Sequence, residues 1–185
     1  NIDPFVQGGN PYPIYHTNML HGLMAGLSRL SGLDPLIIWY GSLGVAKVLI
    51  ASGIGYLTWA ILPSRWAMAV AILFVVIARG PVTFSIYPNQ LAPWFLFPVV
   101  MAVCIRSVEW SMRRAFIIVL AAALLIGSFH GLYAGFSVLL GSTVLGVMVA
   151  WRLARRSTRR SARSPMIALC GLLLGGMVYP VVSQV

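Results

Sequence analysis

The chain has 185 residues, 59% of them apolar and only 9% charged, and its mean hydropathy is +0.90. Because soluble domains carry roughly a quarter charged residues, this composition excludes a water-soluble globular protein and indicates one that is solvated by lipid. The net charge of +10 would also suit nucleic acid, but no aromatic residues alternate with the arginines to stack on bases. We therefore expect no nucleic-acid partner.

Residues 1–34 form the first predicted unit, a polar loop over 1–13 followed by an amphipathic helix over about 14–30. Five large apolar side chains share one stripe of this helix: Leu20, Leu23, Met24, Leu27 and Leu30. We expect the helix to lie along the membrane surface, or against the bundle, rather than to cross the membrane. Asp34 and Pro35 then provide an N-cap and a first-turn proline for the next helix.

The second unit, 35–185, is predicted to be the membrane-spanning part. A span needs about 20 apolar residues, and five runs meet or approach this length: 36–62, 89–105, 115–128, 132–151 and 166–182. A shorter run, 66–78, spans only if the arginines at its two ends snorkel to the interfaces. The predicted fold class is all-α, a polytopic transmembrane helical bundle with about six spans plus one interfacial amphipathic helix.

A hairpin is predicted within 115–151, because this stretch carries no charge and is too long for a single span. The segment Gly127-Ser128-Phe129-His130-Gly131 offers the turn. His130 is therefore expected at the tip of a hairpin between two spans.

The arginines predict the orientation. Ten of the thirteen basic residues lie in short gaps between apolar runs, where cytoplasmic loops carry positive charge. We expect loops 106–114 and 152–165 to be cytoplasmic, which puts His130 on the outer face. The side of the membrane on which residues 1–34 lie stays open, because the number of basic residues on each side is the same whether or not 66–78 spans. The preference for arginine over lysine is typical of a GC-rich bacterial genome, so the expected location is a bacterial plasma membrane.

Polar residues on the outer face are the candidate binding residues. Arg79 ends the short span, and its forked donors suit a lipid-linked phosphate. His130 could hydrogen-bond a phosphate or a sugar hydroxyl, or merely cap a helix. His16, Tyr87 and Gln90 complete the substrate-binding set. Each also has a simpler explanation as an ordinary interfacial residue, and Tyr87 and Trp94 are typical of the aromatic belt.

A charged residue within a predicted span is the other unusual feature. Lys47 lies near the middle of span 36–62, where an unpaired charge costs a few kcal/mol. We expect it to face the bundle interior or an aqueous cavity.

No catalytic residue and no metal site are assigned. Paired carboxylates, a Gly-rich phosphate loop and a cysteine–histidine cluster are not evident, and Cys104 and Cys170 share no metal-ligand spacing. The chain begins without a methionine in a polar stretch and stops just after an apolar run. We therefore expect it to be a piece of a larger protein, with part of its chemistry elsewhere.

The order of the short motifs resembles the glycosyltransferase-C superfamily, polytopic membrane enzymes that use polyprenyl-phosphate sugars at the outer face. The resemblance covers most of the chain and is carried by Asp3-Pro4-Phe5, Tyr12-Pro13 with His16, Leu33-Asp34-Pro35, Tyr87-Pro88, and His130 with Tyr133. It implies a polyprenyl-phosphate sugar donor, a glycan, lipid or protein acceptor, and contact with membrane lipid.

The same resemblance implies an acidic residue in a first extracytoplasmic loop upstream of Asn1, acting as base or metal ligand. No cofactor is evident in this chain, and a divalent metal is implied only if that loop is present. The resemblance also places 1–34 outside, which favours six spans. Two alternatives stay open: a transporter or flippase of a lipid-linked or small polar solute with Lys47 lining the path, and a structural subunit without a site.

Overall fold

The computed structural model describes residues 6–7, 10–11, 19–78, 91–154 and 159–182. Almost all of them are helical, which confirms the predicted all-α class. The only strands in these described ranges are β1 (Val6–Gln7) and β2 (Asn10–Pro11), a two-residue antiparallel pair.

The start of the bundle follows the local sequence signals. Helix α2 (Met19–Ser31) is terminated by Gly32, whose φ of +68° is readily adopted only by a residue without a Cβ. Helix α3 (Pro35–Ile61) begins where predicted, since Asp34 Oδ1 accepts a hydrogen bond from the Leu36 N–H at 2.7 Å and Pro35 occupies the first turn.

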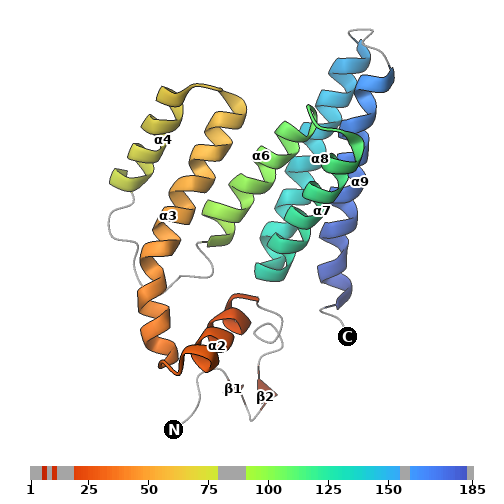
Figure 1. The fold of residues 1–185 in the computed structure, drawn as a ribbon. Coiled ribbons are helices and arrows are strands. Elements are labelled where there is room, and N and C mark those ends of the chain that lie inside the picture. The colour runs from red at the N-terminus through yellow and green to blue at the C-terminus, as the bar shows by residue number, and fades with distance from the viewer. Residues whose placement is uncertain (1–5, 8–9, 12–18, 79–90, 155–158, 183–185) are drawn as a thin grey trace.

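The remaining helices run alternately up and down (Figure 1). Helix α4 returns beside α3, and a π-helical turn, η2, leads into α6; the antiparallel helices α7, α8 and α9 complete the bundle. Their bounds are Arg65–Ala78 (α4), Ala92–Leu96 (η2), Phe97–Ser107 (α6), Met112–Phe129 (α7), Gly131–Ala154 (α8) and Arg159–Val182 (α9). The main core lies between α6, α7, α8 and α9, where Val100, Val119, Leu145 and Leu172 are fully buried.

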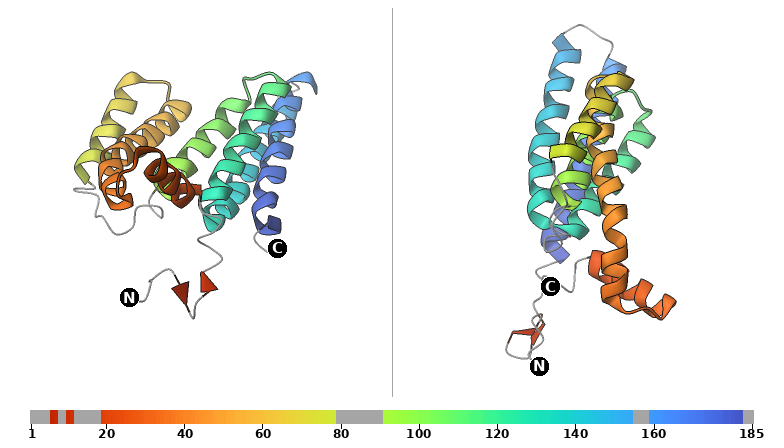
Figure 2. Two further views of the ribbon diagram at one scale, coloured as in Figure 1. Left: turned by 60° about the horizontal axis from the view of Figure 1, so that its bottom comes forward. Right: turned by 90° about the vertical axis from the view of Figure 1, so that its left-hand side faces the viewer.

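The bundle has two distinct ends (Figures 1 and 2). The arginine end carries the connection from α6 to α7 and the facing ends of α8 and α9. The histidine end carries His130, between α7 and α8, together with α2. Helix α2 packs on α3 and touches α7, so it lies at the end opposite the arginines, a position that the charge count left open.

The length and apolarity of three helices are sufficient for a membrane span: α3, α7 and α8. The apolar parts of the others are shorter, namely Arg65–Ile77, Ala92–Ser107 and Arg163–Gly176. Many large apolar side chains face outward, Trp66 at 83% exposure and Phe74 at 70% among them. Such a surface suits lipid rather than water, so the chain is a helical membrane protein, and the number of six spans stays a prediction.

The expected position of Lys47 is wrong. Lys47 is exposed on the surface of α3 rather than enclosed in the bundle. Its neighbours Ala46 and Ile50 face the core instead, because only one side of a helix can pack against the rest of the bundle. On α2, Met24 alone among the described stripe residues is buried, while Leu30 is 88% exposed.

Candidate functional site

His130 occupies the sharp connection between α7 and α8. Its backbone N–H donates to the Ile126 carbonyl at 2.9 Å, and its own carbonyl accepts from the Ala134 N–H at 3.1 Å. The main chain of this one residue therefore closes α7 and opens α8. The imidazole is not used for capping, which removes the simplest structural explanation for a histidine here.

The His130 imidazole is half-buried against one aromatic ring. It meets Tyr133 edge to face, with ring centroids 4.9 Å apart and an angle of 63° between the planes. Its Nδ1 atom is buried and has no hydrogen-bond partner among the described residues. Burial also lowers the pKa of His130, because desolvation disfavours the imidazolium. The ring is thus predominantly neutral at neutral pH, with one nitrogen that lacks a partner.

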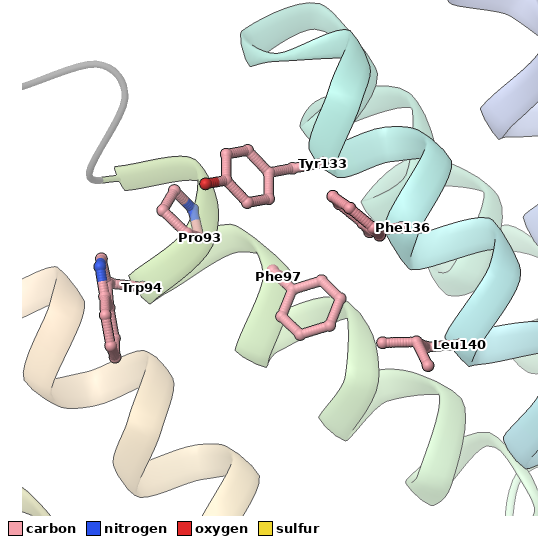
Figure 3. A pocket seen from close by; sticks show the side chains of 6 residues that line it. All are labelled: Pro93, Trp94, Phe97, Tyr133, Phe136 and Leu140. Atoms are coloured by element: carbon pink, nitrogen blue, oxygen red, sulfur yellow. The ribbon is translucent and has the colours of Figure 1, made fainter.

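Next to this pair lies a groove between α8 and the start of α6 (Figure 3). Its volume is about 290 Å³, and six residues line it: Pro93, Trp94, Phe97, Tyr133, Phe136 and Leu140. The lining is almost wholly apolar. The Tyr133 ring reaches across the groove with its hydroxyl directed toward Pro93. His130 itself does not line the groove but touches the residue that closes one end of it.

The π-helical turn η2 shapes the α6 wall of the groove. Pro98 has no N–H, and its ring would collide with the carbonyl of Trp94 in a regular α-helix. The helix widens just before it, and the Phe97 N–H bonds to the Ala92 carbonyl five residues earlier. Wide turns of this kind often occur at functional sites. Here the turn carries Pro93 and Trp94, two of the lining residues.

The groove opens on the outer surface of the bundle. Trp94, Phe136 and Leu140 are each between 40% and 46% exposed, and in a membrane protein such a surface faces lipid. Along α8 the lining runs from Tyr133 to Leu140, roughly 10 Å at 1.5 Å per residue. A volume near the lower end of the usual ligand range suits part of a long apolar chain that enters sideways from the bilayer.

Of the residues predicted to bind substrate, the structure places one. His16, Arg79, Tyr87 and Gln90 lie outside the described residues, and their roles stay predictions. His130 is described, and its neighbour Tyr133 was named with it among the motifs of the family resemblance.

Sequence reasoning missed the groove residues Pro93, Phe97, Phe136 and Leu140 and assigned Trp94 to the aromatic belt. The available signal was the spacing of Tyr133, Phe136 and Leu140, which puts them on one face of α8. That spacing does not say which helix faces them.

Within the described ranges, no three His, Cys, Asp or Glu side chains gather where a metal ion could be held. No protein-family model, curated protein or solved structure matches the chain. The functional argument therefore starts from His130 and the neighbouring groove.

Proposed function

We propose that the chain is part of a membrane glycosyltransferase that takes a sugar from a polyprenyl-phosphate donor at the histidine end of the bundle. In this proposal the groove between α6 and α8 holds the first part of the donor's isoprenoid chain. His130 and Arg79 hold the phosphate, and a carboxylate outside the described residues activates the acceptor hydroxyl.

One observation carries the proposal: an apolar, lipid-facing groove ends beside a histidine whose buried Nδ1 has no partner in the described part of the chain. A lipid-linked phosphate has the same layout, with an apolar chain joined directly to a polar head. Leaving a buried polar group without a hydrogen bond costs about 1–3 kcal/mol. If the imidazole turns outward, a phosphate at the end of the groove can supply the missing bond and recover that cost.

The chemistry assigned to these residues is limited. In the transfer, the acceptor oxygen forms a bond to the sugar C1 while the bond from C1 to the phosphate oxygen breaks. The acceptor's proton goes to the carboxylate, and the phosphate leaves with the bonding electron pair. A neutral His130 with its proton on Nδ1 donates one hydrogen bond to the departing phosphate, and the Arg79 guanidinium offsets its growing charge.

The alternative, a transporter or flippase with Lys47 lining its path, has less support. Lys47 is exposed on α3 and does not line the groove. The two functions also differ in their products, because a flippase moves the lipid-linked sugar intact.

A matched pair of substitutions on α8 tests the groove. Leu140 lines it, whereas the adjacent Leu139 is 63% exposed and lies about 100° further around the helix. We expect Leu140→Trp to fill the groove and raise the KM for a polyprenyl-phosphate sugar roughly tenfold, as for the loss of one well-packed apolar contact. Leu139→Trp should leave it unchanged. The measurement is transfer of radiolabelled sugar by membranes that contain the full-length protein.

His130→Ala tests the phosphate contact in the same assay. Loss of a hydrogen bond to a charged group should lower kcat/KM about ten- to a hundredfold. Unchanged transfer by both Leu140→Trp and His130→Ala would contradict the proposed site. Movement of intact donor across vesicles without any transfer would establish the flippase instead.

A further inference from the structure

A second cavity, open to the surface, is lined by residues at the start of α7. This start lies at the arginine end of the bundle (Figure 1). Its volume is about 420 Å³, and Ser111, Arg113, Arg114, Ile117 and Ile118 line it. All five lie at the start of α7, where Arg114 shares a face with Ser111, Ile117 and Ile118 at spacings of three, three and four. The cavity is polar and cationic at the end of the bundle and becomes apolar one turn further in.

The two arginines have no carboxylate partner among the described residues. The acidic side chain nearest in sequence is Glu109, and it pairs with Arg106 at 3.2 Å. Arg106 also lies over the Trp59 ring, 4.5 Å from its centroid. The guanidinium of Arg114 lies over the Trp110 ring at 5.1 Å, which orients it while leaving its N–H donors for another acceptor.

The connection that leads into these arginines is held in place. Ser164 of α9 is buried, and its Oγ lies 2.8 Å from the carbonyl oxygens of both Ser107 and Trp110. Arg152 Nη1 donates to the Val108 carbonyl at 3.3 Å. Contacts from α8 and α9 thus hold the connection that contains Trp110, and the Arg114 guanidinium lies over the ring of this residue. The position of Arg114 beside the cavity is therefore stabilised.

We propose that this cavity binds the headgroup of an anionic phospholipid. Guanidinium groups match the oxygens of a phosphate diester, and basic side chains at the cytoplasmic end of a membrane helix attract anionic headgroups. Ile117 and Ile118 lie directly deeper along α7 and provide the surface for the acyl chains. This apolar continuation favours a lipid over a soluble phosphate. The proposal does not depend on the glycosyltransferase assignment.

Lipid selectivity in vesicles tests the proposal. The purified full chain is placed in phosphatidylcholine vesicles with spin-labelled phosphatidylglycerol or spin-labelled phosphatidylcholine, and the protein-bound fraction of each label is compared. The wild type should prefer phosphatidylglycerol. In R113Q/R114Q that preference should fall at least tenfold, since a direct hydrogen bond to a charged phosphate contributes about ten- to a hundredfold to binding.

The matched control is R65Q/R163Q, which removes the same charge from two exposed arginines at the same end of the bundle. It should retain most of the preference, and circular dichroism should show all variants equally helical. An equal loss in both double variants, or no loss in R113Q/R114Q, overturns the site. Inorganic phosphate, compared with chloride at equal ionic strength, should not displace the lipid. Displacement would assign the cavity to free phosphate and overturn the lipid proposal.

Discussion

His130 combines two roles within one residue, because its main chain and its side chain do different things. The backbone ends α7 and begins α8, so the turn does not depend on the imidazole. The imidazole rests on Tyr133 with its Nδ1 buried and without a partner among the described residues. The turn does not need the imidazole, and its buried Nδ1 lacks a hydrogen bond. His130 is therefore a candidate for ligand binding.

The lowered pKa of His130 predicts a pH dependence of stability. Above its ordinary pKa of 6.5, the imidazole is neutral in both the folded and the unfolded chain. As the pH falls below that value, the unfolded chain takes up a proton first, so the free energy of unfolding decreases until the folded pKa is passed. The wild type should therefore lose more stability than His130→Gln on acidification. Thermal unfolding in detergent from about pH 7.5 to pH 5 measures this difference.

His16 and His21 also titrate in this range, and both remain in His130→Gln. Their contribution is therefore subtracted in the comparison of the two proteins. Parallel stability curves for wild type and variant would show that His130 is not desolvated in the folded protein. A bound phosphate would oppose the effect, since a nearby anion favours the imidazolium.

At the scale of helices, the contact between α7 and α9 depends on glycine. Gly171 and Gly175 are four residues apart and face the backbone of α7. A Cβ atom on Gly171 would lie 3.0 Å from the Phe116 carbonyl oxygen, and one on Gly175 would lie 2.7 Å from Ala123 Cβ. Small residues let membrane helices approach closely, and lipid offers no hydrophobic force to replace the lost contacts.

We therefore expect Gly175→Ala to destabilise the folded protein by about 1–3 kcal/mol through overpacking against α7. The control is Gly146→Ala on α8, where a Cβ meets nothing within 4 Å. That change should be neutral or stabilise by about 0.5–1 kcal/mol, because alanine has the higher helix propensity. Denaturation in mixed micelles compares the two. A loss in Gly146→Ala as large as that in Gly175→Ala would contradict this explanation, because a Cβ at position 146 has no neighbour to overpack.

At the scale of the whole molecule, the bundle separates two chemistries. The histidine end has the groove and His130, and the arginine end has the basic cavity and the ion pair between Arg106 and Glu109. Cytoplasmic loops are enriched in arginine, so the arginine end is expected in the cytoplasm. The donor site would then open on the outer face.

Thiol labelling tests this orientation. In a background with Cys104→Ala and Cys170→Ala, we expect an impermeant reagent to label His130→Cys in whole cells. Ser111→Cys, at the exposed start of α7, should react only after the membrane is opened. Labelling of the position 130 variant solely from within would reverse the orientation and contradict the proposed transfer at the outer face.

The sequence by itself determined most of the helices and several of their ends. The start of α9 is an exception, because Arg159 begins this helix inside the predicted loop 152–165. Each membrane helix forms its hydrogen bonds within one segment, so apolar length and local caps were sufficient. Asp34 and Pro35 begin α3, and the turn at His130 divides α7 from α8, as predicted. His130 and Tyr133 were also identifiable, because polar residues stand out between two long apolar runs.

Only the tertiary structure decided which helices meet. In lipid both the packed and the outward faces of a helix are apolar, so hydropathy does not distinguish them. The pairing of Phe97 on α6 with Phe136 on α8, which makes the groove, could therefore not be derived from spacing. The close approach of Gly175 to α7 and the exposure of Lys47 have the same origin. They depend on how the bundle packs, and residues distant in the chain determine that packing.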